Sequence, residues 1–277
     1  MKIVLTGSNG QLGMALMNVL KKEDVLEIDT HNCDITIKNE VVSKIISFSP
    51  DVVLHCAAYT AVEQAEDDPE QCYKVNVEAT ENIAKACLET GAGLLYVSTD
   101  YVFTGEGEVP YEVNDETKPL SVYGKSKLQG EEMIKKLMTN FYIVRTSWLF
   151  GDGNNFVKTM LGVAENKNKL SIVSDQIGSP TYAVDLANTI YDIIRTEKYG
   201  MYHVTNEGFY SWADFAQLIF AKIKTFVEID RVTSEAYQAK AERPKNSRLS
   251  KASLETNGFM RLPSVEDALE RYLKTIN

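Results

Sequence analysis

A glycine-rich turn near the N-terminus constrains the fold of this chain more than any other feature of its sequence. Gly7, Gly10 and Gly13 follow a short apolar run at 2–6 and open an amphipathic segment at 11–22. Glycines between a strand and a helix permit a tight turn and let the backbone approach a ligand closely. The free N–H groups at the start of the helix attract phosphate. The turn therefore predicts a dinucleotide site, and we expect three further residues there: Asn9, Gln11 and Leu12.

The spacing of this turn is G-x-x-G-x-x-G, and taken alone it also fits an ordinary strand–helix connection. A second signal is Asp29, about 20 residues after Gly7, the offset typical of the carboxylate that binds ribose hydroxyls. The alternative for Asp29 is a solvated residue at a strand end. No Lys or Arg follows it closely to bind a 2′-phosphate, which predicts a preference for NADH over NADPH. Asp34 and Ile35 are expected beside the adenine ring, or else on a surface loop.

Short apolar runs alternate with longer amphipathic segments through the first 150 residues. Runs with little polar alternation are typical of parallel strands buried on both faces. Strands that alternate with helices form right-handed crossover units. The pattern therefore predicts an α/β fold with a doubly wound, Rossmann-type parallel sheet. The expected strands are 2–6, 25–29, 51–56, 94–98 and 141–146, and the expected helices are 11–22, 39–48, 69–90 and 122–138.

Beyond residue 150 the alternation is less regular. A chain of 277 residues is long for one compact core and short for two independent ones. We therefore predict a dinucleotide-binding domain at 1–150 and a smaller C-terminal α/β substrate-binding lobe at 151–277. Part of 181–200 is expected to pack back onto the first domain. Helices in this half are expected at 155–165, 183–195, 211–224 and 264–275.

Composition and charge exclude several functions. The net charge of −10 disfavours binding to nucleic acid or to an anionic membrane surface. The first apolar run is too short for a signal peptide, and no run approaches the length of a membrane span. Cys33, Cys56, Cys72 and Cys87 have no C-x-x-C spacing and are expected to be reduced thiols. We expect a cytoplasmic protein without a bound metal.

Tyr123 and Lys127 form a Tyr-x-x-x-Lys pair, which places both side chains on one face of the expected helix 122–138. An ammonium beside a tyrosine favours the phenolate and lowers its pKa, and the same lysine can hold nicotinamide ribose hydroxyls. With 14 tyrosines in the chain, one such pair is expected by chance, so a packed tyrosine and a solvated lysine are the alternative. Thr99 follows the run 94–98, where ligands of open parallel sheets bind.

The glycine turn, Thr99 and the Tyr-x-x-x-Lys pair together resemble the extended short-chain dehydrogenase/reductase superfamily. Within it, the chain is similar to the nucleotide-sugar reductases that form dTDP-L-rhamnose. This resemblance implies reduction of the C4 keto group of dTDP-6-deoxy-L-lyxo-4-hexulose by NADH or NADPH. It also implies that Tyr123 gives the proton, Thr99 bonds the same oxygen and Lys127 binds the ribose. The similar segments are 55–63, 98–103, 123–128, 145–151, 175–181 and 243–247.

The resemblance also implies ligand contacts. Trp148 is expected to cover the apolar face of the sugar, with a buried core position as the alternative. Arg243 and Arg248 are expected either at the substrate diphosphate or on a solvated loop. Additional cofactor contacts are expected at Ala57, Ala58 and Tyr59. The expected sugar contacts are Thr60, Val62, Asp100, Tyr101 and Trp148.

Two other functions stay open. A nucleotide-sugar epimerase would use the same Tyr and Lys, whereas a dehydratase would normally have Glu where this chain has Tyr101. A non-catalytic, reductase-like accessory subunit is the alternative from another class, and it would have no chemical need for the reactive trio. Some members of the family dimerise through a metal held by glutamates. Residues 11–16 offer no carboxylate, so we expect a monomer or a weak homodimer.

Overall fold

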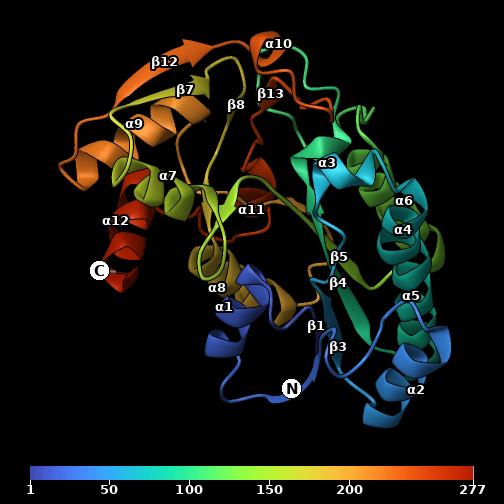
Figure 1. Ribbon diagram of the computed structural model, residues 1–277. Coiled ribbons are helices and arrows are strands. Elements are labelled where there is room, and N and C mark those ends of the chain that lie inside the picture. Colours follow the sequence, from blue (N-terminus) through green and yellow to red (C-terminus); the bar gives the residue numbers. More distant parts are fainter. Residues whose placement is uncertain (277) are drawn as a thin grey trace.

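The computed structural model describes residues 1–276, and a six-stranded parallel sheet lies at its centre (Figure 1). The strand order is β10-β5-β4-β3-β1-β2, and every neighbouring pair is parallel. The predicted doubly wound, Rossmann-type sheet is therefore confirmed. Its first five strands are β1 (Lys2–Thr6), β2 (Asp24–Ile28), β3 (Val52–His55), β4 (Gly93–Thr99) and β5 (Phe141–Thr146).

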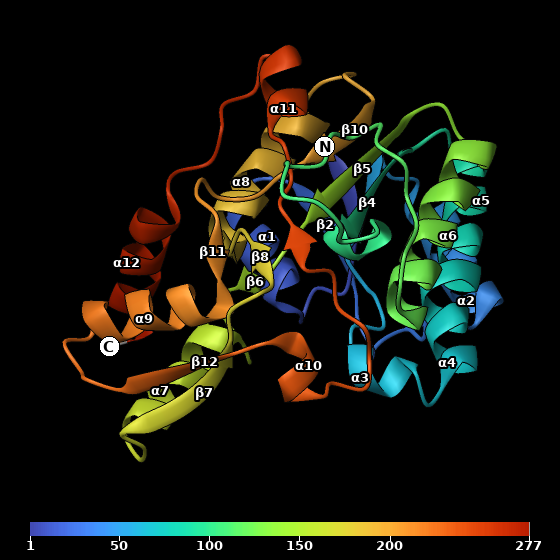
Figure 2. The ribbon, with the colours of Figure 1, turned by 90° about the horizontal axis from the view of Figure 1, so that it is seen from above.

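Helices cover both faces of this sheet, as the nearly continuous apolar strands require. On one face α1 packs beside α8, and Leu16 and Ile190 belong to the core between these helices and the strands. On the other face α2, α5 and α6 lie together, with Ile45 and Ile83 in a second core (Figures 1 and 2). Their bounds are α1 (Gln11–Val19), α2 (Lys38–Phe48), α5 (Ala79–Thr90), α6 (Val122–Leu137) and α8 (Ala183–Ile194).

The sixth strand of the sheet comes from beyond the predicted boundary at residue 150. β10 (Gly200–His203) pairs with β5 at the sheet edge, after α8 has returned to pack against α1. The sequence analysis left residues 200–203 in the second lobe, and the structure corrects this. The residues of β10 are Gly, Met, Tyr and His, and so short a run shows little hydrophobic periodicity. Only the pairing with β5 identifies the strand.

The segment 69–90, predicted as one helix, contains a π-helical turn. α4 (Pro69–Tyr73) leads into η1 (Lys74–Glu78), which continues as α5. Asn76 in this turn is buried; its Oδ1 accepts from Tyr59 N at 2.8 Å, and its Nδ2 donates to Ser126 Oγ at 2.9 Å. The turn thus ties the loop after β3 to α6. π-turns inside helices are frequent at functional sites.

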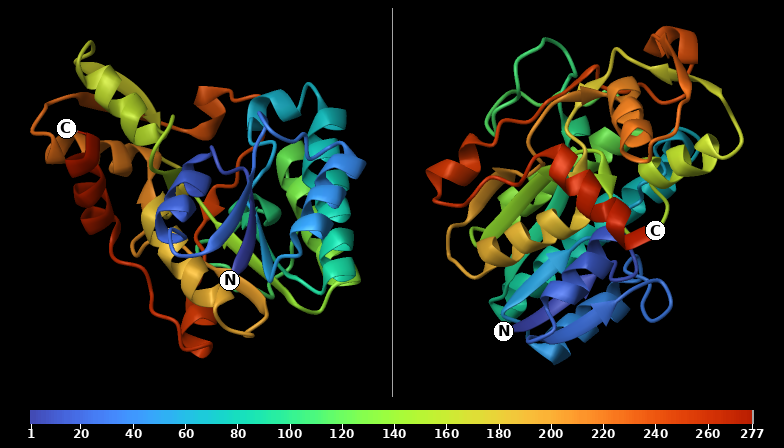
Figure 3. Two further views of the ribbon diagram at one scale, coloured as in Figure 1. Left: turned by 90° about the horizontal axis from the view of Figure 1, so that it is seen from below. Right: turned by 90° about the vertical axis from the view of Figure 1, so that its left-hand side faces the viewer.

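The second lobe has a core of its own, in which Phe150, Phe215 and Leu269 are buried. Figures 2 and 3 show this lobe on one side of the large sheet, with the β7–β12 ribbon at its outer edge. Within residues 1–276, no helix is long and apolar enough to cross a membrane. The helices of the second lobe are α7 (Phe156–Ala164), α9 (Trp212–Lys222), α10 (Ser234–Tyr237) and α12 (Val265–Ile276). The strands of its ribbon are β7 (Lys169–Val173) and β12 (Glu228–Val232).

Short strands pair between the two lobes and within the second lobe. β6 (Leu149–Phe150) pairs with β9 (Thr181–Tyr182). A three-stranded sheet joins β11 (Tyr210–Ser211), β8 (Ile177–Gly178) and β13 (Asn246–Ser247). These strands place the start of α9 and the connection after β5 close to the carboxyl edge of the large sheet. Three further short helices are α3 (Val62–Ala65), the 3-10 helix η2 (Asp100–Val102) and α11 (Ala252–Thr256).

Candidate active site

A cleft of about 780 Å³ lies at the carboxyl ends of the large sheet's strands and extends to the second lobe. Ligands of open parallel sheets bind at this edge. All but one of the predicted site residues line it. These are Thr99, Tyr123 and Lys127; Gly7, Asn9, Gly10, Gln11, Leu12, Gly13, Asp29, Asp34, Ile35, Ala57 and Ala58; and Thr60, Val62, Asp100, Tyr101 and Trp148.

Three residues that the sequence analysis considered lie outside the described lining of the cleft. Tyr59, the exception among the predicted contacts, instead holds the loop after β3, because its backbone exchanges hydrogen bonds with Asn76. Arg243 pairs with Glu63 of α3. Arg248 donates from Nη1 to Asn246 Oδ1 at 3.0 Å. The structure thus holds both arginines by protein carboxylate or amide groups.

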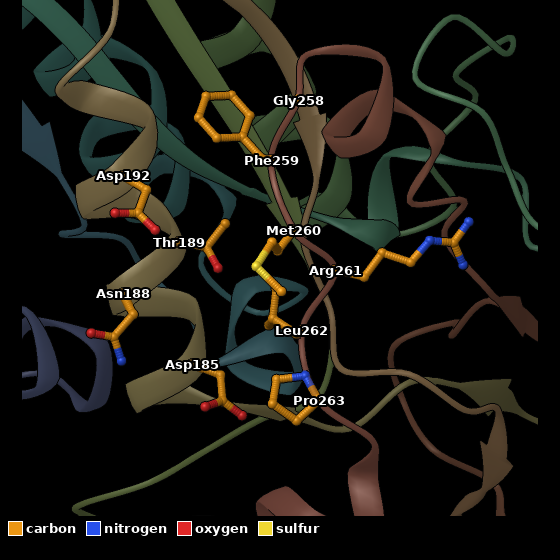
Figure 4. Close-up of a pocket in the computed structure, with 10 residues that line it drawn as sticks. All are labelled: Asp185, Asn188, Thr189, Asp192, Gly258, Phe259, Met260, Arg261, Leu262 and Pro263. Carbon is orange, nitrogen blue, oxygen red and sulfur yellow. The ribbon is translucent and has the colours of Figure 1, made fainter.

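A second, smaller pocket of about 360 Å³ lies between α8 and residues 258–263 (Figure 4). It shares no described lining residue with the cleft. Its buried carboxylate, Asp185, is already bound by Arg271 at 2.7 and 2.8 Å and by Asn206 at 2.8 Å. These bonds join α8 to α12, so we assign Asp185 a structural role and place the candidate chemistry in the larger cleft.

The glycine turn forms a close backbone cradle at one end of the cleft. Gly7 has φ +72°, and a Cβ on it would lie 2.8 Å from Ala57 N. A Cβ on Gly13 would lie only 2.1 Å from Gly7 O, so the helix can approach the turn only without a side chain there. Within the described chain, no side chain caps α1 and its first turn has no acidic residue. Its N–H groups and partial positive charge are therefore available to an anion.

Several buried polar atoms in the cleft wall are suited to a ligand. Gln11 Oε1, Ser98 Oγ and Thr146 Oγ1 have no hydrogen-bond partner among residues 1–276. Buried polar atoms in proteins are nearly always paired. Together with the glycine cradle, these atoms fit a nucleotide cofactor that brings its own hydroxyl, amide and phosphate groups to the cleft.

We predict that Gly13→Ala destabilises the protein and weakens dinucleotide binding. The new methyl group would overlap Gly7 O, and overpacking of this kind costs about 1–3 kcal/mol. The matched control is Gly162→Ala in α7, where a Cβ would meet nothing within 4 Å. This substitution should stabilise the helix slightly, because alanine has a higher helix propensity than glycine. Urea unfolding and titration with NADH test both variants. Equal unfolding free energies and equal affinities for the two variants would contradict the steric argument.

The predicted trio converges on the middle of the cleft. Thr99 ends β4, and α6, capped by Ser121, carries Tyr123 and Lys127 one turn apart. Lys127 is only 2% exposed, and its Nζ lies 3.8 Å above the centroid of the Tyr96 ring. A desolvated cation over an aromatic face is an attractive contact. The ring therefore supports an ammonium that has little water around it.

Burial dominates the electrostatics of the trio and corrects one expectation. Lys127 was expected to lower the pKa of Tyr123, but desolvation raises the pKa of Tyr123 well above its usual value. Desolvation also lowers the pKa of Lys127 to about 7, against the opposing effect of Glu131. The tyrosine hydroxyl is therefore protonated at neutral pH. A protonated tyrosine suits donation to an oxygen that is becoming an alkoxide, which is a stronger base than a phenolate.

The residues around Thr99 form a compact polar group. Thr99 Oγ1 donates to Asp100 Oδ1 at 3.0 Å and accepts from Tyr101 N at 3.2 Å. Tyr101 meets Tyr123 edge to face, with 5.6 Å between ring centroids. Burial raises the pKa of the Asp100 carboxyl to about 6. Hydroxyl, carboxyl and phenol groups thus face the same part of the cleft.

Buried polar contacts fix the loop that lines the other side. His55 Nδ1 lies 2.7 Å from Thr6 Oγ1, and its Nε2 lies 3.0 Å from Thr80 Oγ1. Burial lowers the pKa of His55 to about 3, so the ring is neutral and joins β1, β3 and α5. Thr6 Oγ1 also accepts from Ala57 N at 3.2 Å. His55 therefore has the structural role that the sequence analysis favoured.

The sequence analysis missed one prominent member of the cleft wall, Trp212. It is the first residue of α9 and stacks on Trp148, with ring centroids 3.6 Å apart and an interplanar angle of 10°. Both indoles are partly buried and line the cleft, so Trp148 is not a core residue. No local motif marks Trp212, because only the packing of the second lobe brings it beside Trp148.

Comparison with known proteins places the chain in a family. The model of the RmlD substrate binding domain matches residues 1–277. A dTDP-4-dehydrorhamnose reductase from Aggregatibacter actinomycetemcomitans is 42% identical, with 89% of each chain covered. A crystal structure of an ortholog of this reductase from Clostridium acetobutylicum is 40% identical and has a TM-score of 0.97, covering 100% of this chain and 99% of that one.

A second crystal structure, of dTDP-4-dehydrorhamnose reductase from Bacillus anthracis in complex with NADP, is 41% identical and has a TM-score of 0.96, covering 99% of each chain. The match in sequence and the match in structure thus extend over both lobes. They confirm the resemblance found in the sequence. The chain belongs to the RmlD substrate binding domain family.

Proposed function

We propose that this protein is a reductase that converts dTDP-6-deoxy-L-lyxo-4-hexulose to dTDP-L-rhamnose with a nicotinamide dinucleotide. The observation that carries the proposal is the placement of the glycine cradle and the Thr99, Tyr123 and Lys127 trio in one cleft. The similarity of the whole chain to proteins named dTDP-4-dehydrorhamnose reductase supports the choice of substrate.

The bound nicotinamide supplies hydride to C4 of the sugar. Tyr123, kept protonated by burial, donates its hydroxyl proton to the C4 oxygen as negative charge develops there. Thr99 turns its hydroxyl proton from Asp100 Oδ1 to the same oxygen and so stabilises the developing charge. Lys127 binds the ribose hydroxyls and, in its protonated form, adds positive charge beside the tyrosine. Asp29, at the end of β2, accepts hydrogen bonds from the adenosine ribose.

Both walls of the cleft contribute to sugar recognition. Asp100 and Tyr101 offer a carboxyl and a phenol to sugar hydroxyls, and Thr60 adds a hydroxyl from the loop after β3. Val62 and Trp148 supply apolar surface to the ring hydrogens and the methyl group of a deoxysugar. The cleft thus offers both polar groups and apolar surface, which match the hydroxyls and the apolar faces of the substrate.

The test is loss of NADH or NADPH absorbance when purified protein meets enzymatically generated dTDP-6-deoxy-L-lyxo-4-hexulose, with NMR identification of the product. We expect stoichiometric cofactor oxidation and formation of dTDP-L-rhamnose. Interconversion of sugar epimers with no net cofactor consumption would instead support an epimerase. A folded protein that binds cofactor but turns over neither substrate would support the accessory-subunit alternative.

We also propose a preference for NADH over NADPH, which rests on Asp29. Its Oδ1 accepts from His31 N at 2.8 Å and Asn32 N at 3.2 Å, which fixes a carboxylate at the cleft edge. A 2′-phosphate beside it would meet like charge. We expect kcat/KM to be about tenfold higher with NADH, and Asp29→Asn, which keeps the acceptor oxygen, to narrow this ratio. Initial rates with both cofactors test this, and a wild-type preference for NADPH would overturn it.

A further inference from the structure

Trp148 has a backbone conformation that bulky residues rarely adopt. Its φ is +50°, in the left-handed region. The residue lies between β5 and β6, and its carbonyl oxygen accepts from Thr181 N at 3.1 Å. Such a conformation persists only where surrounding contacts hold it in place. The question is therefore which contacts hold Trp148.

Two residues of the second lobe, Trp212 and Gly178, contact the Trp148 ring. Trp212 lies parallel to it at 3.6 Å, whereas unconstrained aromatic pairs prefer offset or edge-to-face arrangements. Gly178 of β8 lies against the edge of the ring, since a Cβ there would be 2.8 Å from Trp148 Cε2. One face and one edge of the indole are thus covered by protein.

Trp212 is itself firmly anchored. Its Nε1 donates to Gln176 Oε1 at 3.2 Å, and the Gln176 side chain is buried. Phe156 of α7 packs against its ring at 4.6 Å between centroids. Ser211 and Asp214 form a capping box at the start of α9 and fix the helix turn that carries the indole. Trp212 is therefore a rigid support for Trp148.

We infer that Trp212 is a positioning residue for sugar recognition. Trp212 covers one face of the Trp148 ring, so only the opposite face is left to the ligand. The stack also keeps Trp148 in its unfavourable backbone conformation. The inference rests on the proposed function, because the proposed function makes Trp148 the platform for the sugar. Loss of Trp212 should raise the KM for the sugar nucleotide and leave cofactor binding unchanged, because the glycine cradle is formed by the turn between β1 and α1 and not by α9.

The chain provides a spectroscopic readout of this pair. It has two tryptophans, and both belong to the stack. Indoles at this distance couple electronically, and the circular dichroism spectrum contains an exciton couplet when their transition dipoles are twisted relative to each other about the stacking axis. Replacement of either tryptophan removes the couplet whatever happens to activity. The geometry can therefore be tested without the substrate.

The experiment compares Trp212→Leu with Trp212→Phe, which keeps a flat ring on Trp148. For Trp212→Leu we expect loss of the couplet, an increase of about tenfold in KM for the sugar nucleotide, nearly unchanged kcat and unchanged NADH affinity. Trp212→Phe should also lose the couplet but recover most of the KM. This rescue distinguishes support of Trp148 from a general loss of stability, which thermal unfolding of both variants monitors.

The result that would overturn the inference is a folded Trp212→Leu variant whose KM for the sugar nucleotide equals that of the wild type. A failure of the proposed function looks different. In that case the wild type shows the couplet and binds NADH, yet does not reduce the keto sugar.

Discussion

Replacement of Tyr123 by Phe is expected to lower turnover by about 10²–10⁴-fold, the usual contribution of a positioned general acid. The ring and its packing against Tyr101 remain, and only the hydroxyl proton is lost. Burial keeps that hydroxyl protonated, so Tyr123 has a proton to give to the C4 oxygen. NADH affinity should stay close to that of the wild type, since the glycine cradle is untouched.

The matched control is Tyr96→Phe, which removes a buried phenol outside the lining of the cleft as the structure describes it. The variant keeps an aromatic ring under Lys127 and loses the Tyr96 hydroxyl, whose hydrogen bond to Asn76 O is 3.5 Å long. Single-turnover rates and NADH titration measure both variants. Turnover of Tyr123→Phe equal to that of Tyr96→Phe would remove Tyr123 from the mechanism.

The second large effect concerns a buried ion pair. Arg145 and Glu131 are 1% and 0% exposed, and they form a bidentate contact with distances of 2.8 and 2.6 Å. Glu131→Met leaves a guanidinium that cannot lose its charge inside the protein. We expect the free energy of unfolding to fall by about 3–5 kcal/mol, as measured by urea denaturation.

Two controls test the origin of this loss. The double variant Glu131→Met with Arg145→Met should recover much of the stability, because the buried guanidinium is removed together with its partner. Arg231→Met breaks the exposed pair with Asp214, in which both side chains are 44% exposed, and should cost at most about 1 kcal/mol. Similar losses for Glu131→Met and Arg231→Met would show that burial does not determine the cost.

The features that the sequence predicted are those encoded by local spacing. The glycine turn is identified by its position between a strand and a helix. Tyr123 and Lys127 are four residues apart, so they share one face of a helix. Thr99 follows an apolar strand whose end must lie at the ligand edge of a parallel sheet. Each inference needs only the residues of one segment and the geometry of one element.

The features that sequence reasoning missed depend on tertiary contacts. Trp212 reaches the cleft only because α9 packs beside the connection after β5. The π-turn at Asn76 inserts a residue that helical periodicity does not register. The predicted direction of the pKa shift of Tyr123 was also wrong. The spacing shows that Lys127 is near Tyr123, but it does not show that both groups are buried. Burial is a property of the whole fold.

The position of β10 also bears on how this chain is made by the ribosome. When residue 150 has been synthesised, β5 is paired with β4 but not yet with β10. The helix α1 is not yet covered by α8. Leu12 and Leu16 then face solvent instead of the apolar side of α8. The nascent nucleotide domain is thus completed only after about 200 residues have emerged. A fragment cut at residue 150 would therefore expose an open sheet edge and a bare helix face, both of which favour aggregation.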